Sequence, residues 1–486
     1  MAWETVMGLE VHVELATKSK IFCSCTTEFG GEPNTHCCPI CTGMPGTLPV
    51  VNKQVVNFAM KAGIALNCDI TRYNKFDRKN YFYPDLPKAY QISQLYLPIC
   101  RNGRVPIETE SGVKKDIRIH EIHMEEDAGK LIHDEFNDET KCDYNRCGVP
   151  LIEIVSEPDF RSADEVIAYL SKLKSTLEYL GVSDCKMQEG SMRADVNLSV
   201  RKVGEEEFGT RTEMKNLNSF KAISKAIAFE AKRQIDLLER GGKVVQETRR
   251  WDDNKDKSYA MRSKENAQDY RYFPEPDIPP IDIDDEWFNS IESSLPELAP
   301  EKKARYIKDF GLPEYDANMI TGQKALADFF EETTAICNNP KEVSNWIMGE
   351  LMRKLSDEGI EAKDMKLTSK ALAKLIELVD KKTINRNKAK EIFGIAFNED
   401  LDVEKYVKDN NLEQVSDEGL VLDIVKKVIE NNPQPVADYN SGNKKAIGFL
   451  MGQCMKELKG KGDPGVVNKL LSQELNLSLI HISEPT

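Results

Sequence analysis

The spacing of apolar residues changes once along this chain, at a proline-rich stretch. Before residue 273, short runs with a period of two, typical of strands, alternate with a few helical runs. The segment Phe273-Pro-Glu-Pro-Asp-Ile-Pro-Pro280, followed by Pro296 and Pro300, interrupts both patterns because proline lacks a backbone donor. From about Pro300 onward, apolar residues recur almost only at helical spacing. The sequence therefore predicts an α+β fold class, with a strand-rich unit followed by all-α structure.

This pattern predicts about three domains, which suits a chain of 486 residues because one hydrophobic core rarely grows that large. We place a strand-rich domain at residues 1–295, a helical domain at 296–432 and a small helical tail at 433–476, after the break Asn431-Asn-Pro-Gln-Pro435. Within the first domain, the capping box Ser162-x-x-Glu165 predicts a helix that ends at Gly181, and a second helix is expected from about Ser219 to Arg240. Residues 477–486 do not continue the helical pattern, so we treat them as a candidate non-native tail.

The composition is that of an ordinary globular protein, with 40% apolar and 30% charged residues. No run approaches the roughly 18 consecutive apolar residues that a membrane span needs. The first residues lack a basic segment followed by an apolar run, so we expect no secretory signal, a cytoplasmic location and no membrane partner. The net charge is 66 − 81 = −15, which argues against a nonspecific coat on nucleic acids, because phosphate affinity depends on Lys and Arg.

The first strand-like run carries its charged residues on one side. In Leu9-Glu-Val-His-Val-Glu-Leu15, Glu10, His12 and Glu14 share one parity and therefore one face of a strand. Two further runs repeat the alternation and contribute Arg193, Asp195, Glu213 and Lys215. A solvated outer face of an antiparallel sheet is the ordinary explanation for one such strand. Three strands that combine carboxylates with His, Arg and Lys favour a shared polar site.

A run of adjacent acids, Glu125-Glu-Asp127, precedes Ala128 and Gly129. Magnesium prefers oxygen ligands together with the phosphates of a substrate. Carboxylates with an imidazole, and with Arg and Lys to offset phosphate charge, are therefore suited to phosphoryl transfer with Mg²⁺.

Five of the twelve cysteines lie between Cys23 and Cys41, and four of them form two close pairs. Cys23-x-Cys25 and Cys38-x-x-Cys41 offer the four thiolates that a structural Zn²⁺ prefers. His36 and Cys37 stand beside the second pair and are alternative ligands. Disulfides are not expected in a reducing compartment, so the spacing predicts a structural zinc knuckle, with four unligated thiols as the alternative.

Several common motifs are absent from the chain. It has no G-x-x-x-x-G-K-[ST] loop, so any ATP would not be held in a P-loop. It also has no Gly/Ser-rich amidase loop and no evident Cys–His glutaminase arrangement. The sequence therefore gives no sign that this chain releases a nitrogen donor by itself.

Seven long and unusual motifs are spread along the chain. They are Met7-Gly-Leu-Glu-Val-His12, Arg78-Lys-Asn-Tyr-Phe-Tyr-Pro-Asp-Leu-Pro87, Glu125-Glu-Asp-Ala-Gly-Lys130, Pro150-Leu-Ile-Glu-Ile-Val-Ser-Glu-Pro-Asp159, Glu189-Gly-Ser-Met-Arg193, Lys215-Asn-Leu-Asn-Ser-Phe220 and Asp269-Tyr-Arg-Tyr-Phe-Pro-Glu-Pro276. In these motifs the chain resembles the B-subunit family of tRNA-dependent aspartyl/glutamyl-tRNA amidotransferases, and the resemblance extends to about Leu475.

The resemblance implies a glutamine-synthetase-like cradle domain with an antiparallel sheet, a helical domain and a helical tail that contacts tRNA. It implies an ATP-dependent carbon–nitrogen ligase that phosphorylates the side-chain carboxylate of Glu-tRNA(Gln), Asp-tRNA(Asn) or both, and then amidates it. It also implies a heterotrimer with an amidase-type glutaminase subunit, which frees ammonia from glutamine, and a small third subunit. The expected cofactors are ATP, Mg²⁺ and structural Zn²⁺.

Carried onto this sequence, the resemblance implies Glu10, His12 and Glu125 as metal ligands. Asp195 and Glu213 would complete the metal shell or orient ammonia. The shared strand faces, more than the resemblance, predict that Arg193 and Lys215 contact phosphate. Tyr81 and Tyr83 are candidates for the wall of the pocket, with burial in the core as the alternative.

In the tail, between Asn440 and Leu475, basic residues outnumber acidic ones by 6 to 3, which favours a tRNA-backbone contact over an ordinary solvated face once the resemblance is considered. The basic residues are Lys444, Lys445, Lys456, Lys459, Lys461 and Lys469. Two other functions remain open: a free-standing ATP-dependent ligase that amidates a small amino acid, and a non-catalytic zinc-knuckle scaffold that presents tRNA to an enzyme.

Overall fold

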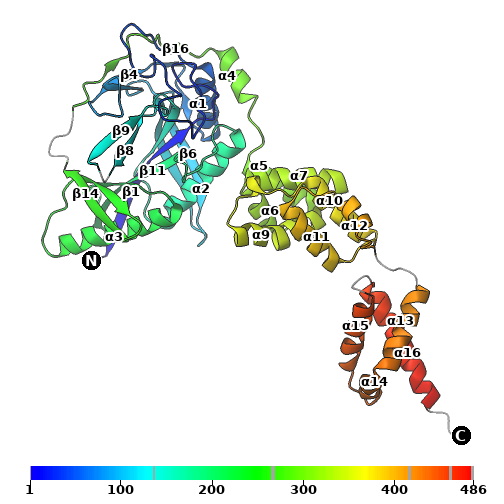
Figure 1. The fold of residues 1–486 in the computed structure, drawn as a ribbon. Helices are drawn as coiled ribbons and strands as arrows, with labels where there is room; N and C mark the ends of the chain where they lie inside the picture. Colours follow the sequence, from blue (N-terminus) through cyan, green and yellow to red (C-terminus); the bar gives the residue numbers. More distant parts are fainter. Residues whose placement is uncertain (1, 135–136, 264–268, 414–417, 459–461, 483–486) are drawn as a thin grey trace. The chain divides into compact units, whose positions relative to one another are not determined.

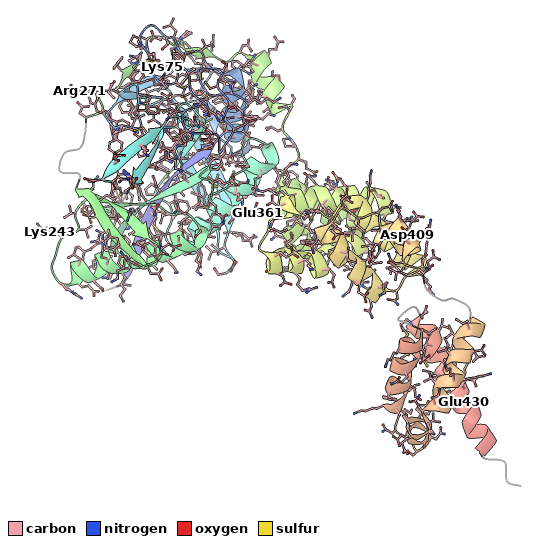
Figure 2. The ribbon with its side chains drawn as sticks, viewed as in Figure 1. Lys75, Lys243, Arg271, Glu361, Asp409 and Glu430 are labelled. Carbon is pink, nitrogen blue, oxygen red and sulfur yellow. The ribbon has the colours of Figure 1, made fainter. Side chains whose placement is uncertain are left out.

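A computed structural model describes residues 2–134, 137–263, 269–413, 418–458 and 462–482 (Figure 1). The chain divides into two compact units, residues 1–298 and 299–486. Figure 2 shows the described side chains on the same view. None of the described helices is both long enough and apolar enough to span a bilayer.

A nine-stranded sheet forms the centre of the first unit. In spatial order its strands are β14 (Lys257–Ser263), β13 (Glu247–Asp252), β12 (Thr212–Lys215), β11 (Met192–Lys202), β1 (Trp3–Glu14), β10 (Pro150–Ser156), β7 (Lys114–Glu126), β6 (Cys100–Glu108) and β2 (Asp69–Ile70). The first strand of the chain, β1, is therefore central, and it pairs antiparallel with both β10 and β11.

The expectation of a purely antiparallel sheet is wrong at one pair. Strands β12 and β13 run parallel, so the sheet is mixed. The reason lies in the connection between them, because helix α3 (Phe220–Glu239) follows β12 and returns the chain to the starting end of the strand. Parallel neighbours need such a crossover, whereas the antiparallel pairs do not.

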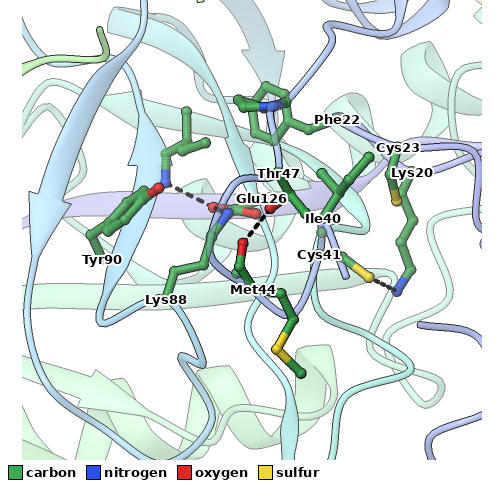
Figure 3. Close-up of a pocket in the computed structure, with 14 residues that line it drawn as sticks. Lys20, Phe22, Cys23, Ile40, Cys41, Met44, Thr47, Lys88, Tyr90 and Glu126 are labelled. Carbon is green, nitrogen blue, oxygen red and sulfur yellow. Dashed lines mark hydrogen bonds and ion pairs between the residues drawn. The ribbon is translucent and has the colours of Figure 1, made fainter. Parts of the chain in front are cut away.

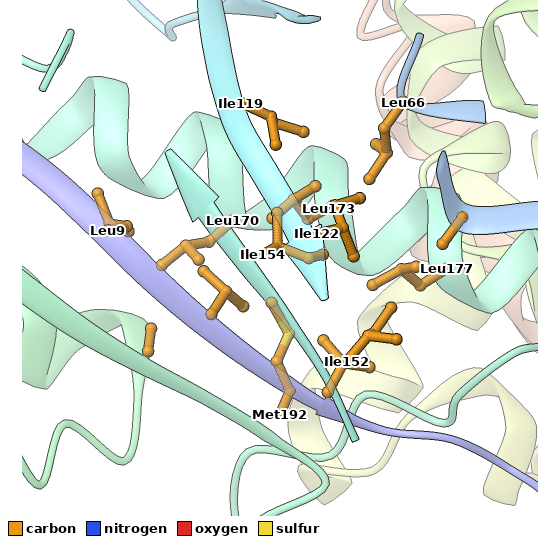
Figure 4. Close-up of a cluster of buried hydrophobic side chains, with 14 of the residues drawn as sticks. Leu9, Leu66, Ile119, Ile122, Ile152, Ile154, Leu170, Leu173, Leu177 and Met192 are labelled. Atoms are coloured by element: carbon orange, nitrogen blue, oxygen red, sulfur yellow. The ribbon is translucent and has the colours of Figure 1, made fainter. Parts of the chain in front are cut away.

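Helices α1 (Lys53–Ala65), α2 (Ala163–Leu180) and α3 contact strands of the sheet, and apolar residues of all three helices join its apolar face in one core (Figure 1). Figure 4 shows side chains of β1, β7 and β10 packed against Leu170, Leu173 and Leu177 of α2. The predicted ends of α2 are confirmed: the Ser162 hydroxyl accepts from the Glu165 amide at 3.2 Å, and Gly181 adopts the left-handed conformation that ends a helix. The second predicted helix is α3, capped by Ser219.

Smaller elements complete the first unit. Strands β15 (Phe273–Pro274), β4 (Asp77–Asn80) and β5 (Tyr90–Ser93) form one small sheet, so the proline-rich segment pairs with a strand almost 200 residues earlier. Two further sheets have two strands each: β16 (Ile281–Asp282) pairs with β3 (Tyr73–Asn74), and β8 (Lys130–Asp134) pairs with β9 (Glu139–Asp143). Helix α4 (Asp285–Glu292) is the last helix of this unit.

The second unit is helical throughout its described residues, as predicted from about Pro300 onward. Its elements are α5 (Ala299–Phe310), α6 (Glu314–Thr321), α7 (Lys324–Cys337), α8 (Pro340–Trp346), a π-helical turn (Ile347–Leu351), α9 (Met352–Glu358), a 3₁₀ turn (Ala362–Asp364), α10 (Ser369–Asp380), α11 (Arg386–Asn398), α12 (Val403–Asp409), α13 (Glu418–Asn431), α14 (Pro433–Asn440), α15 (Ala446–Glu457) and α16 (Pro464–Ile482).

These helices enclose two separate hydrophobic cores, one between Tyr306 and Val407 and one between Val421 and Leu475. The second core includes Val421, Val425 and Val428 of α13, which precedes the predicted start of the tail at residue 433. We therefore propose that the tail unit begins at α13. The prediction that the helical pattern stops after residue 476 is wrong, because α16 continues to Ile482.

Candidate active site and metal centre

The face of the sheet opposite the helices is polar at its centre. Strand β1 buries Leu9, Val11 and Val13 in the core, and the alternation of the strand directs Glu10 and His12 to the other face. The register across four strands then aligns His123, Glu153, His12 and Arg193 in one row, on β7, β10, β1 and β11 respectively. The predicted shared face of β1 and β11 is thus present, and β10 and β7 extend it.

A first group of metal-competent side chains consists of His12, Glu125 and Glu153, whose ligand atoms all lie within 4.8 Å of one another. The Nε2 atom of His12 lies 3.7 Å from Oε1 of Glu125 and 3.4 Å from Oε2 of Glu153. His123 adjoins the group, with its Nε2 atom 3.1 Å from Oε2 of Glu153. Two carboxylates and an imidazole fit a divalent cation that takes its remaining ligands from water or phosphate.

Burial and charge in this group oppose each other. Burial alone would raise the pKa of Glu153, but the charge of His123 and the close contact with His12 hold it well below its usual value. Burial alone would lower the pKa of His123, but the charge of Glu153 and close contacts with Glu121 and Glu125 raise it well above its usual value. Glu153 is therefore a buried anion whose charge is offset by two imidazoles in this structure, and a bound cation would take over that role.

A second group consists of Glu10, Asp195 and Glu213, again with ligand atoms within 4.8 Å of one another. The ammonium of Lys215 lies 2.6 Å from Oδ2 of Asp195 and 2.9 Å from Oε1 of Glu213. Burial raises the pKa of Glu10, and the charges of Glu153 and Glu213 raise it further, while a hydrogen bond from Asn197 opposes them. Three carboxylates in such proximity require positive charge, and Lys215 supplies it in this structure.

The structure therefore divides the predicted site residues into two groups on neighbouring strands. His12 and Glu125 lie together, whereas Glu10 lies with Asp195 and Glu213. Sequence reasoning missed Glu153 and His123 as members. Glu153 carried a signal, because it interrupts the apolar run of Pro150–Ser156 as its single charged residue.

The adjacent acids Glu125, Glu126 and Asp127 do not form one cluster. Glu125 belongs to the first metal-competent group. The next residue, Glu126, forms an ion pair with Lys88 and accepts from the amide of Ile92 at 2.9 Å. Asp127 binds Arg193 at 2.8 Å. Alternation along β7 directs Glu125 and Glu126 to opposite faces, and Asp127 lies beyond the end of the strand, so adjacency in sequence did not mean proximity in space.

Both residues predicted to contact phosphate are engaged by carboxylates. Arg193 donates to Asp127, and Lys215 donates to Asp195. The pKa of Glu14 is raised to about 8. Burial is the largest cause, the charge of Asp127 raises this pKa further, and the charge of Arg193 lowers it. Arg193 and Lys215 therefore stand on the polar face as predicted, each already paired with an anion.

A lysine and three tyrosines lie beside the first group. Burial alone would lower the pKa of Lys79, but the charge of Glu125 raises it above its usual value. The Nζ atom of Lys79 lies 5.1 Å from the ring of Tyr270, which contacts both Tyr81 and Tyr272 edge to face. Burial, with Glu125 contributing, raises the pKa of Tyr81 to about 12. Tyr81 is thus partly buried near the site, while Tyr83 is exposed, and neither belongs to the core.

The strand that carries Lys79 is fixed by a partly buried guanidinium, that of Arg78. Arg78 donates two hydrogen bonds to Glu275, at 2.6 and 3.0 Å, and one to Asp277 at 3.0 Å. Its guanidinium also lies 4.2 Å from the ring of Tyr90. Bidentate pairs of this kind fix orientation as well as distance. The proline-rich segment around Glu275 therefore helps to position Lys79.

A cavity of about 600 Å³ opens on the same side of the sheet as Glu10. Gly8 lines it, and its missing side chain leaves room above β1 near Ser156 and Pro158. The other lining residues are Val6, Leu9, Glu10, Val155, Ser156, Pro158, Asn197, Ser199, Phe208, Gly209, Thr210, Arg211 and Gln246. The second metal-competent group thus adjoins a space large enough for part of a small-molecule ligand.

The four cysteines predicted to bind zinc converge. The sulfurs of Cys23, Cys25, Cys38 and Cys41 all lie within 4.8 Å of one another, and those of Cys38 and Cys41 are 3.9 Å apart. Tetrahedral zinc with Zn–S bonds of about 2.3 Å separates its sulfurs by about 3.8 Å, so the four thiols fit the ion. A hydrogen bond with Cys23 is the main cause that lowers the pKa of Cys41 to about 5, while burial opposes it and the amide of Cys38 and the charge of Lys20 lower it further.

The two alternative ligands lie outside this group among the described residues. Cys37 donates to the carbonyl of Asn34 at 3.3 Å, and Nδ1 of His36 lies 3.2 Å from the carbonyl oxygen of Glu28. The arrangement therefore favours a four-sulfur site, which leaves no open position for substrate and is typical of a structural zinc.

Comparison with known proteins finds similarity along nearly the whole chain. Residues 5–289 match the GatB/GatE catalytic domain, and residues 328–475 match the GatB domain. The B subunit of aspartyl/glutamyl-tRNA(Asn/Gln) amidotransferase from Lachnoclostridium phytofermentans is 64% identical over 474 residues, which cover 98% of this chain and 99% of that protein.

Two further relatives carry the same name. The protein of Agathobacter rectalis is 64% identical over 473 residues, covering 97% of this chain and 99% of its own length. That of Thermoanaerobacter pseudethanolicus is 56% identical over 476 residues, covering 98% of this chain and 100% of its own length. With two family matches and relatives of this identity over their full length, the chain belongs to the family of aspartyl/glutamyl-tRNA(Asn/Gln) amidotransferase B subunits.

Proposed function

We propose that this chain uses ATP to activate the side-chain carboxylate of Glu-tRNA(Gln), Asp-tRNA(Asn) or both, and that ammonia then converts the activated group to the amide. The observation that carries this proposal is the pair of metal-competent groups on one sheet face, joined through Glu10 and His12 of the same strand. Such neighbouring acidic groups suit phosphoryl transfer, in which charge gathers on the oxygens of the phosphoryl group.

The chemistry requires activation because a carboxylate is a poor acyl donor. In the proposed reaction a carboxylate oxygen attacks the γ-phosphorus of ATP, which gives an acyl phosphate and ADP. Ammonia then attacks the acyl carbon and expels inorganic phosphate. Mg²⁺ held by His12, Glu125 and Glu153, or by Glu10, Asp195 and Glu213, would offset the charge on the phosphates. Arg193 and Lys215 lie on the same face and contribute positive charge beside these groups.

The cavity beside Glu10 is our candidate position for the nucleotide. Its lining combines an exposed aromatic ring, Phe208, with the cation Arg211 and the amides of Asn197 and Gln246. A base can stack on an aromatic ring, while polar groups fix its orientation. The phosphates of a nucleotide bound there would reach toward the acidic groups on β1 and β11.

The proposal includes partners because the sequence offers no means of releasing ammonia. The relatives are named as B subunits, which implies further subunits in those proteins. For this chain we propose a cytoplasmic heterotrimer with an amidase-type glutaminase subunit and a small third subunit. The four-cysteine site would hold structural Zn²⁺ in this assembly.

Reconstitution tests the proposed reaction directly. The chain is mixed with its proposed partner subunits, mischarged tRNA, Mg²⁺-ATP and either glutamine or an ammonium salt. We expect amide formation with both nitrogen sources when all subunits are present, and with ammonium alone when the glutaminase is inactivated. Turnover of free glutamate without tRNA would instead support the free-standing ligase. Full amidation after Glu10→Ala would support the non-catalytic scaffold.

The helical tail is the proposed tRNA contact. Lys444 and Lys445 are exposed just before α15, while Lys459 and Lys461 lie outside the described residues. We expect the double substitution Lys444→Glu and Lys445→Glu to raise the KM for aminoacyl-tRNA. The slope of log binding constant against log salt concentration should become shallower by about 2. The KM for ATP should not change, because the nucleotide is proposed to bind in the other unit.

A matched control reverses two exposed charges in the first unit, Lys232→Glu and Lys243→Glu, and should leave the KM for aminoacyl-tRNA unchanged. Filter binding at several salt concentrations gives the slope. Unchanged tRNA affinity in the tail variant would exclude the tail contact.

A further inference from the structure

Lys20 is fully buried beside the four-cysteine site, with none of its surface exposed. Its Nζ atom donates to Sγ of Cys41 at 3.8 Å, and Figure 3 shows this contact at the edge of a cavity of about 80 Å³. A buried ammonium is costly unless an anion or several acceptors surround it. The position of Lys20 therefore needs a source of negative charge.

The nearest buried carboxylate on this cavity does not supply it. Glu126 lines the same cavity but forms an ion pair with Lys88, which lies beside it in Figure 3. It also accepts from the amide of Ile92. Within the described residues, no carboxylate forms an ion pair with Lys20. The cysteine sulfurs are therefore the remaining source of negative charge for this lysine.

Four thiolates around one Zn²⁺ have a net charge of −2, and such a centre in a partly buried position gains from nearby donors and cations. The amide of Cys38 already donates to Sγ of Cys41 at 3.1 Å. We propose that Lys20 is a positioning residue of the zinc centre, whose ammonium offsets the charge of the thiolates and orients Cys41. This inference requires that the cysteines bind zinc, and it is independent of the proposed ATP chemistry.

The test is the zinc affinity of the full-length Lys20→Met variant, because methionine keeps most of the length of the side chain and removes its charge. Competition with a chromophoric chelator should show a Kd for zinc that is raised roughly 10- to 100-fold, the usual effect of removing a partner of a metal ligand. Lys18→Met removes an exposed lysine two residues away and should keep the wild-type Kd. Lys88→Met removes the other buried lysine of the cavity and should alter zinc affinity far less than Lys20→Met.

A spectroscopic measurement separates a charge effect from general damage. In the Co²⁺-substituted protein, loss of the lysine should move the thiolate-to-metal charge-transfer band to longer wavelength, because the sulfur electrons are no longer stabilised by a nearby cation. Lys20→Arg keeps the charge and should retain more of the wild-type affinity than Lys20→Met. If Lys20→Met is unfolded as purified, refolding by excess zinc supports the inference, and failure to refold contradicts it.

The remaining outcomes are equally decisive. A wild-type Kd with an unmoved charge-transfer band in Lys20→Met overturns the inference. An equal loss of affinity in Lys20→Met and Lys88→Met assigns the effect to the cavity and also overturns it. If the wild-type protein binds no zinc, both the zinc site and the role of Lys20 are wrong, while the reconstituted amidation reaction still decides the proposed function separately.

Discussion

Glu153→Gln should reduce the rate of tRNA-dependent amidation by about 10²- to 10³-fold, the usual effect of removing one group that stabilises charge in a transition state. The substitution keeps the shape of the side chain but removes the anion that lies between His12 and His123. The loss should be the same with glutamine and with ammonium, because the activation step precedes the use of ammonia. The Mg²⁺ concentration for half-maximal rate should rise as well.

Glu157→Gln is the matched control. Glu157 lies just beyond the same strand and pairs with His120 at 2.9 Å, outside both metal-competent groups. It should retain nearly the full rate, and glutamine hydrolysis by the partner should be unaffected in either variant. If Glu153→Gln amidates at the wild-type rate, the first metal-competent group is not catalytic, and the scaffold hypothesis gains support.

Cys41→Ser should release the zinc and destabilise the first unit. If the free zinc concentration is about 1,000 times the Kd, bound zinc stabilises the folded state by about 4 kcal/mol. Because the first unit spans residues 1–298, this loss would lower its Tm by about 6 °C. Metal analysis and thermal unfolding, each with and without a strong chelator, measure both effects.

Cys37→Ser is the control, since Cys37 is the neighbouring thiol outside the four-sulfur group. This variant should keep one zinc per chain and should respond to the chelator as the wild type does. Equal zinc loss in Cys37→Ser and Cys41→Ser would show that the ligand set differs from the four cysteines that converge in the structure.

Local sequence patterns predicted some parts of this site well. The alternation of Leu9-Glu-Val-His-Val fixed which side chains of β1 face the core, because a strand has a period of two. The paired cysteines predicted the four-sulfur group because ligand spacing within one loop is a local property. Neither pattern depends on which other strands lie nearby.

The predictions that failed depended on long-range pairing. The run Glu125-Glu-Asp127 suggested one acidic cluster, yet its members bind three different partners. Lys79 was not singled out, because its position depends on Arg78 and Glu275, which are 197 residues apart. A short stretch of sequence around Lys79 cannot predict a contact between residues so far apart in the chain.

The sequence by itself determined the order of a strand-rich part and a helical part, the polar face of β1, and the four cysteines that gather in one group. Only the tertiary structure decided that β1 lies between β10 and β11, which brings Glu153 to His12 and separates Glu10 from Glu125. It also decided that β12 and β13 run parallel. The physical reason is that side-chain direction follows from the backbone of one strand, whereas neighbours and register follow from the packing of the whole sheet.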